Sequence, residues 1–128
     1  MRVLFAKRVF QVAGIWGLFI LGLLYAAYLA GVEQMTVATS HPHFVHGFFL
    51  LGIAWQVAFL IIATDPIRYR MLMLAAMLEK FPFTLAVLAL YSNGDIPASV
   101  MGAGVIDGIL GILFAVSYVI TADSADAD

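Results

Sequence analysis

Four long apolar runs constrain the fold of this chain of 128 residues more than any other feature. They occupy residues 9–31, 44–63, 71–91 and 97–120. A helix needs about 20 consecutive apolar residues to cross the hydrocarbon core of a bilayer, and each run meets this length. Because the runs are continuous, they predict helices rather than barrel strands, which would show as alternating segments of about 10 residues.

The composition indicates that lipid is the solvent for most of the chain. Hydrophobic residues make up 64% of the sequence and charged residues 11%, whereas an ordinary soluble domain has about 25% charged residues. A net charge of −2 gives no reason to expect a nucleic acid partner. The absence of cysteine excludes disulfides, thiolate metal sites and cysteine nucleophiles.

The connections between the runs are short, so consecutive helices should be antiparallel neighbours. We therefore expect an all-α, integral membrane four-helix bundle of up-down-up-down topology. A single domain would cover residues 1–121, followed by a disordered acidic tail at 122–128. The first run follows basic residues as in a signal peptide, but it is longer than a signal-peptide core of about 7–15 residues. We interpret it as a true span.

The positions of the basic residues predict the orientation in the membrane. In the predicted topology, all Lys and Arg residues outside the runs fall on one side, and the two opposite connections carry none. The positive-inside rule then places both termini and the 64–70 connection in the cytoplasm, as expected for a multi-pass protein of the cell inner membrane. These basic residues are Arg2, Lys7, Arg8, Arg68 and Arg70.

Three charged residues stand inside the third and fourth runs, where a charge costs about 2.5–3.5 kcal/mol at the bilayer centre. Glu79 and Lys80 lie in the third run and Asp107 in the fourth. At a helical rise of 1.5 Å per residue, Glu79 lies about 12 Å from one face and Asp107 about 15 Å from the other. The depths nearly coincide, so the three side chains could meet. Gln56 in the second run falls at a comparable level and could hydrogen-bond to them.

The pairing of these charges leaves several interpretations open. Adjacent helical residues point about 100° apart, so Lys80 should pair with Asp107 rather than neutralise both acids. The pair could be structural, fixing helix register, with Glu79 protonated or reaching towards the surface. It could instead form a ligand, proton or ion site, because charges inside the membrane are usually functional. It could also dock a partner subunit.

Three histidines stand close together at His41, His43 and His46, where the second run begins. On a helix, His43 and His46 share a face, and imidazole suits zinc, copper and haem iron. The competing interpretation is an interfacial helix start, with Ser40 or His41 as the cap and Pro42 in the first turn. Because only Glu33 is near as a further ligand, we predict no metal site and expect His46 to line a cavity.

Residues 65–118 carry short motifs that resemble small four-helix bacterial membrane proteins of the DoxX-like kind. The motifs are Asp-Pro-x-Arg-Tyr-Arg from Asp65, Leu-Glu-Lys from Leu78, Gly-Asp-x-Pro from Gly94 and Asp-Gly-x-Leu-Gly-x-Leu-Phe from Asp107. The resemblance implies a membrane subunit that hands electrons to or from quinones, often beside a partner protein. Glu79, Lys80 and Asp107 are the residues that it carries over.

The sequence thus favours a small inner-membrane protein that acts as an accessory subunit or binds a small ligand, a quinone or a lipid. Its centre would be Glu79, Lys80 and Asp107, with Gln56 and His46 lining the approach. Two alternatives remain. One is a proton- or ion-coupled transporter, which as a single bundle has little room for a pathway and should be a homo-oligomer. The other is an enzyme acting on a lipid or quinone, with an acid as proton donor. The sequence names no cofactor.

Overall fold

The computed structural model describes residues 1–32 and 41–122, and within these ranges it contains four long helices. Each is long and apolar enough to cross a membrane, as the four runs predict. They are α1 (Arg2–Leu29), α2 (Pro42–Thr64), α3 (Leu72–Ser92) and α4 (Ala98–Ile120). Of the tail predicted at 122–128, residues 123–128 lie outside the described residues, as does the connection at 33–40.

The first helix differs from the predicted run because it begins at Arg2 rather than at residue 9. Hydropathy marks only the apolar part of a helix, whereas the hydrogen-bonded ladder continues through the basic residues, since Lys and Arg are good helix formers. The start of α2 agrees with the interpretation of an interfacial helix start. His41 is the N-cap and Pro42 occupies the first turn, where a missing N–H costs nothing.

The connections follow from residues that favour turns. After α1 ends, Gly31 adopts a φ of 70°, and after α3, Gly94 adopts a φ of 80°, a region that residues with a side chain rarely enter. Between α2 and α3, an oxygen of the Asp65 side chain accepts a hydrogen bond of 3.1 Å from the backbone N–H of Arg68. α2 ends at Thr64 with Asp65 as its C-cap, within the predicted 64–70 connection.

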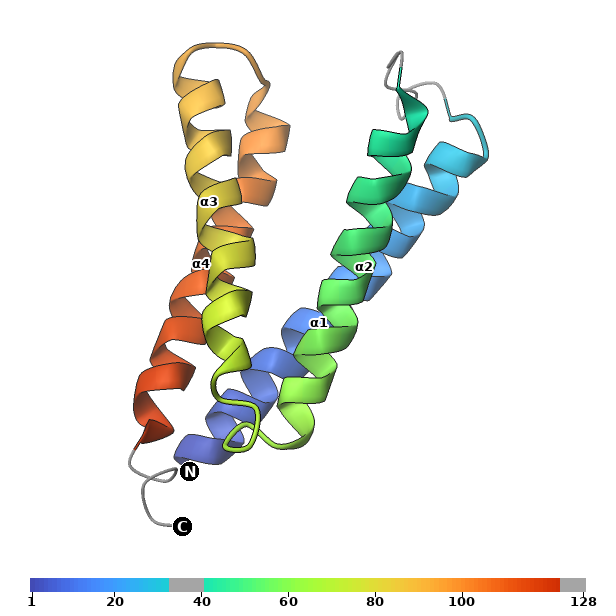
Figure 1. Ribbon diagram of the computed structural model, residues 1–128. Coiled ribbons are helices and arrows are strands. Elements are labelled where there is room, and N and C mark those ends of the chain that lie inside the picture. The colour runs from blue at the N-terminus through green and yellow to red at the C-terminus, as the bar shows by residue number, and fades with distance from the viewer. Residues whose placement is uncertain (33–40, 123–128) are drawn as a thin grey trace.

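The helices form two pairs that diverge from one end of the molecule (Figure 1). α1 packs along α2 and α3 packs along α4, while α1 also contacts α4 and α2 has few contacts with α3. The pairs meet near the start of α1 and the connection between α2 and α3, which we call the closed end. They separate towards the start of α2 and the end of α3, which we call the open end.

The closed end is held by an aromatic core from three helices. The ring of Phe10 on α1 stacks on Phe114 of α4 with centroids 4.2 Å apart, and Phe59 of α2 meets Phe114 edge-on at 4.9 Å. All three rings are fully buried, together with Ile62 and Met73. This cluster joins the two helix pairs where they cross.

Arg70 adds a polar tie at the same end. Its Nε donates a 3.1 Å hydrogen bond to the carbonyl oxygen of Tyr118 near the end of α4. Its guanidinium carbon lies 3.8 Å from the centre of the Tyr118 ring. The negative end of the α4 dipole also stabilises a cation at this position.

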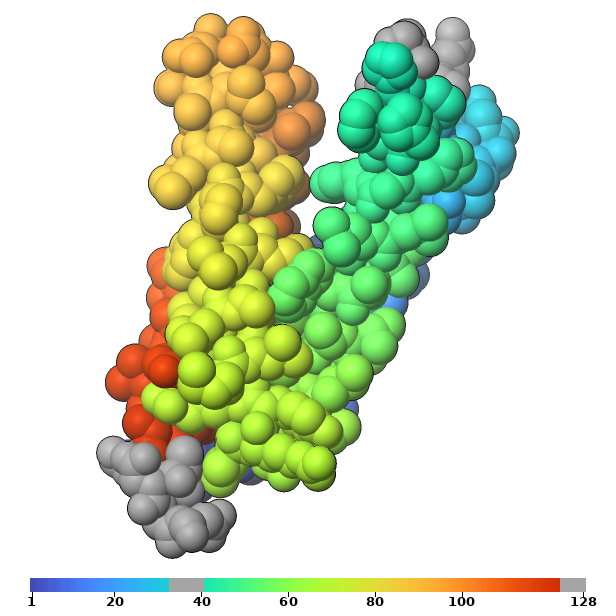
Figure 2. Space-filling model, viewed as in Figure 1, coloured from blue at the N-terminus to red at the C-terminus, as the bar shows by residue number. Residues whose placement is uncertain are grey.

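Many large apolar side chains are exposed on the four helices, and the two pairs stand apart above the core. Figure 2 shows the molecule hollowed between α2 and α3 at the open end. Large side chains such as Phe19 and Leu85 are 64% and 68% exposed, which suits contact with lipid tails.

Candidate functional site

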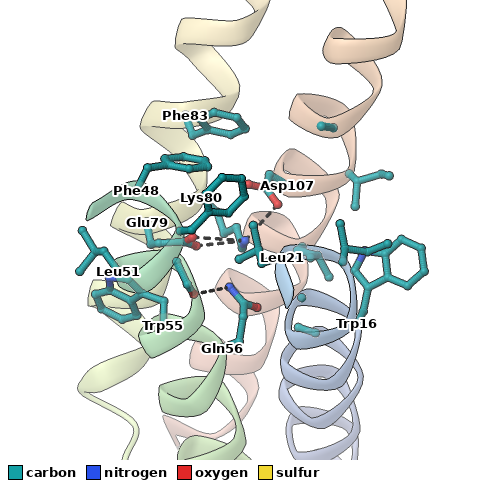
Figure 3. A pocket seen from close by; sticks show the side chains of 18 of the residues that line it. Trp16, Leu21, Phe48, Leu51, Trp55, Gln56, Glu79, Lys80, Phe83 and Asp107 are labelled. Atoms are coloured by element: carbon teal, nitrogen blue, oxygen red, sulfur yellow. Dashed lines mark hydrogen bonds and ion pairs between the residues drawn. The ribbon is translucent and has the colours of Figure 1, made fainter. Parts of the chain in front are cut away.

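A cavity of about 680 Å³ lies between the two helix pairs, above the aromatic core. All four helices contribute to its walls, and most of the lining is apolar. Within the described residues, its charged lining consists of the three residues that the sequence analysis singled out, and Gln56 stands beside them (Figure 3). These residues are Gln56 from α2, Glu79 and Lys80 from α3, and Asp107 from α4.

Lys80 bridges both acids (Figure 3). Its Nζ donates a 3.0 Å hydrogen bond to Oδ1 of Asp107, which confirms the predicted pair between α3 and α4. The same Nζ lies 3.1 Å from Oε2 of Glu79 and donates a longer hydrogen bond of 3.4 Å to Oε1. The cluster therefore holds two acidic groups around one ammonium.

The contact between Glu79 and Lys80 corrects our expectation that Lys80 could serve only one acid. That expectation came from the angle between adjacent Cα–Cβ bonds, about 100° on a helix. The side chains of Lys and Glu have several rotatable bonds, so their charged ends can curl towards each other although their stems diverge. The structure places them in ion-pair contact.

The ammonium of Lys80 is buried, and it packs against an aromatic ring of the core. Its side chain is 6% exposed, and Nζ lies 5.4 Å above the Phe59 ring of the aromatic core. One turn further along α3, the hydroxyl of Thr84 lies 3.0 Å from the carbonyl oxygens of both Lys80 and Gly104. Thr84 thereby ties α3 to α4 beside the cluster.

The cluster offers more hydrogen-bond acceptors than the protein uses. Oε2 of Glu79 is buried and within ion-pair distance of Lys80, but it accepts no hydrogen bond among the described residues. Asp107 is bonded through Oδ1, and its second oxygen has no hydrogen bond within the described part of the chain. The side chains of Glu79 and Asp107 are 20% and 22% exposed, so a molecule in the cavity can reach them.

Gln56 is at the same level, but it makes a different contact from the one predicted. Its Nε2 donates a 3.1 Å hydrogen bond to the carbonyl oxygen of Gly52 on its own helix, rather than to the charged cluster. The amide lies against Gly17 of α1, where any Cβ would collide with the Gln56 side chain. Gly17 is thus the position that admits a buried glutamine into the wall.

His46 is outside the cavity wall, contrary to our expectation. Its Nδ1 is 2.8 Å from the hydroxyl of Tyr25, and the ring also meets Tyr28 edge-on. His46 thus contacts α1 from the first turns of α2. His43 turns instead towards Phe44, with ring centroids 4.4 Å apart. Among the described residues, no group of three His, Cys, Asp or Glu side chains could hold a metal ion.

The aromatic walls of the cavity were not predicted. Trp16 and Trp55 line it from α1 and α2, and Phe48 and Phe83 flank the cluster from α2 and α3 (Figure 3). Aromatic side chains in a membrane helix are equally compatible with lipid contact. Which of them face the cavity depends on how the two helix pairs cross, which no local pattern encodes.

Comparison of the chain with models of protein families, with curated proteins and with solved structures finds no match. The resemblance to DoxX-like proteins therefore remains a prediction that rests on the short motifs in residues 65–118.

Proposed function

We propose that this protein is a small multi-pass protein of the inner membrane that binds a small apolar or lipid-like molecule between its two helix pairs. The observation that carries the proposal is the cavity itself. It is large enough for a ligand, since binding pockets are commonly about 300–1,000 Å³, and it joins apolar walls to a compact charged cluster. This combination suits a molecule with an apolar body and one polar group.

The predicted orientation indicates from which side of the membrane a ligand would reach the cavity. With the termini and the basic 64–70 connection in the cytoplasm, the closed end faces the cytoplasm and the open end faces outward. The ligand would then enter from the outer leaflet or the outer surface. An accessory role fits the same site, with a partner subunit or a second copy covering the divergence between α2 and α3.

Native mass spectrometry of the protein, gently extracted from its own membrane, tests this function. We expect a bound small molecule that is lost in Ala103→Phe, which places a ring in the cavity wall. Ala86→Phe is the matched control, because Ala86 is an exposed residue of α3 that does not line the cavity. A chain that carries no small molecule but holds a stoichiometric partner would favour the accessory role and contradict ligand binding.

Transport is the second candidate, and the one-sided divergence of the helix pairs favours it. A cavity that reaches a buried charged cluster from one side and is sealed on the other by an aromatic core resembles one state of alternating access. In liposomes under an imposed pH gradient, Asp107→Asn should abolish proton-coupled flux, while Asp95→Asn in the exposed α3–α4 turn should not. Equal proton flux in both variants and the unmodified protein would contradict transport.

A further inference from the structure

The charge of the cluster formed by Glu79, Lys80 and Asp107 restricts the class of ligand that the cavity can bind. With both acids ionised, Glu79 and Asp107 carry two negative charges against the single positive charge of Lys80, which leaves the cluster with one negative charge in excess. In surroundings of low dielectric constant, an unbalanced charge is costly and attracts a compensating one. A ligand that brings one positive charge would make the site neutral.

The hydrogen-bonding groups point in the same direction. The ammonium of Lys80 already faces both acids, so little of its donor capacity is offered to the cavity. The groups that remain are acceptors: the second oxygen of Asp107 forms no hydrogen bond within the described residues, and the Glu79 side chain is 20% exposed although its Oε2 is buried against Lys80. Acceptors bind donors, so a protonated amine fits them, whereas a sulfate or phosphate would face two carboxylates.

The walls are suited to an organic cation rather than to a hydrated metal ion. Trp16, Trp55, Phe48 and Phe83 line the cavity, and aromatic faces attract ammonium groups through their quadrupole. The remaining lining is dominated by aliphatic side chains such as Leu21 and Leu51, which can cover an apolar body. A hydrated ion would leave these walls without a partner.

We propose that the cavity selects a lipophilic organic ammonium: an apolar molecule with a single protonated amine that lies against Glu79 and Asp107. The inference rests on the proposed function, since it needs the cavity to bind a ligand at all. The cavity should bind such an ammonium more tightly than neutral quinols and alcohols, and more tightly than anionic lipids.

The two tryptophans of the chain, Trp16 and Trp55, both line the cavity and provide the readout. The protein in discs of zwitterionic lipid is titrated with three probes that share a bromine-tipped dodecyl chain and end in ammonium, hydroxyl or sulfate. Bromine quenches nearby tryptophan fluorescence. Ala103→Phe measures the quenching that comes only from probe dissolved in the lipid, and Ala86→Phe is its matched control.

We expect the ammonium probe to quench at concentrations at least about tenfold lower than the hydroxyl probe, and the sulfate probe to match the lipid background. Glu79→Gln and Asp107→Asn should each remove this preference while keeping the binding of the hydroxyl probe, and Asp95→Asn should leave it intact. If all three probes bind equally above the Ala103→Phe background, the cavity binds ligands but the cation preference is wrong. If none exceeds that background, the proposed function fails as well.

Discussion

The closed and open ends of this molecule are both formed by long apolar helices, but the two ends are packed in opposite ways. At the closed end, Phe10, Phe59 and Phe114 interlock across three helices, and Arg70 is bonded to the end of α4. At the open end, α2 and α3 diverge, and large residues such as Phe44 are exposed. Apolar character alone therefore does not decide which helices meet.

The difference teaches what holds helices together in an apolar solvent. Lipid tails are as apolar as leucine, so association depends on close packing and on polar contacts rather than on escape from water. At the closed end and at the level of Lys80, this close packing and these polar contacts come from the stacked rings, from small residues and from the Lys80 ion pairs. Above it, lipid or a ligand can replace the missing contacts between the helix pairs, which suits a binding site.

The largest effect should come from Lys80→Met, at the boundary between the two ends. Two carboxyl groups would lose the cation that contacts both of them, and removing one partner of a buried ion pair costs about 3–5 kcal/mol. The free energy of unfolding in mixed detergent measures it. The double variant Lys80→Met/Asp107→Leu should recover part of the loss. A double variant as unstable as the single one would show that the unpaired Asp107 carboxylate does not account for the loss.

A direct comparison of the ends pairs Phe10→Ala with Phe44→Ala. Phe10 is fully buried and stacked on Phe114, so its truncation should lower the free energy of unfolding by roughly 3 kcal/mol. Phe44 is 68% exposed, and its truncation should have a small effect. Equal losses in the same unfolding assay would break the comparison, because the open end would then be as tightly packed as the closed end.

A glycine pair on α4 tests packing within the C-terminal helix pair. A Cβ at Gly104 would lie 2.6 Å from Cγ1 of Val87 on α3, so Gly104→Ala should destabilise by about 1–3 kcal/mol. At Gly102 a Cβ meets nothing within 4 Å, and Gly102→Ala should be neutral or slightly stabilising. The melting temperatures of both variants show whether α3 and α4 stay packed against each other in the part of the molecule where the two helix pairs diverge. Identical melting curves for the two variants would contradict this packing.

The smallest effect concerns the polar tie at the closed end. Arg70→Ala removes both the bond to the Tyr118 carbonyl and the contact with its ring, and we expect a loss of about 1 kcal/mol. Arg68→Ala is the matched control, since Arg68 is exposed and its guanidinium carbon is 5.6 Å from the Tyr69 ring. If the two variants have the same free energy of unfolding, the closed end owes its stability to the aromatic core alone.

The helices and the charged cluster were largely predictable from the sequence, for two simple reasons. A long apolar run has one way to satisfy its backbone in lipid, so hydropathy located all four helices. Counting residues along two neighbouring helices placed Glu79, Lys80 and Asp107 at one depth, and the contacts of Lys80 with both acids agree. α1 begins at Arg2, before the apolar run predicted at 9–31, because hydropathy does not mark where the backbone hydrogen bonds of a helix begin.

The details that failed depend on side-chain reach and on neighbours that are distant in sequence. Adjacent positions on a helix did not reveal that Lys80 could curl back to Glu79. His46 was expected at the cavity, but a hydroxyl on α1 holds its ring elsewhere. The partner of Gln56 depends on Gly17, which leaves room for the amide to lie against α1.

The sequence by itself determined that this chain forms four long apolar helices and that opposite charges lie at one depth, because both follow from residue type and helical rise along each segment. Only the tertiary structure decided that the helix pairs converge at one end, that a cavity of about 680 Å³ opens above the aromatic core, and that Trp16 and Trp55 are among the residues that line it. These depend on the crossing of helices, which is set by the summed shape of many side chains and by no short pattern.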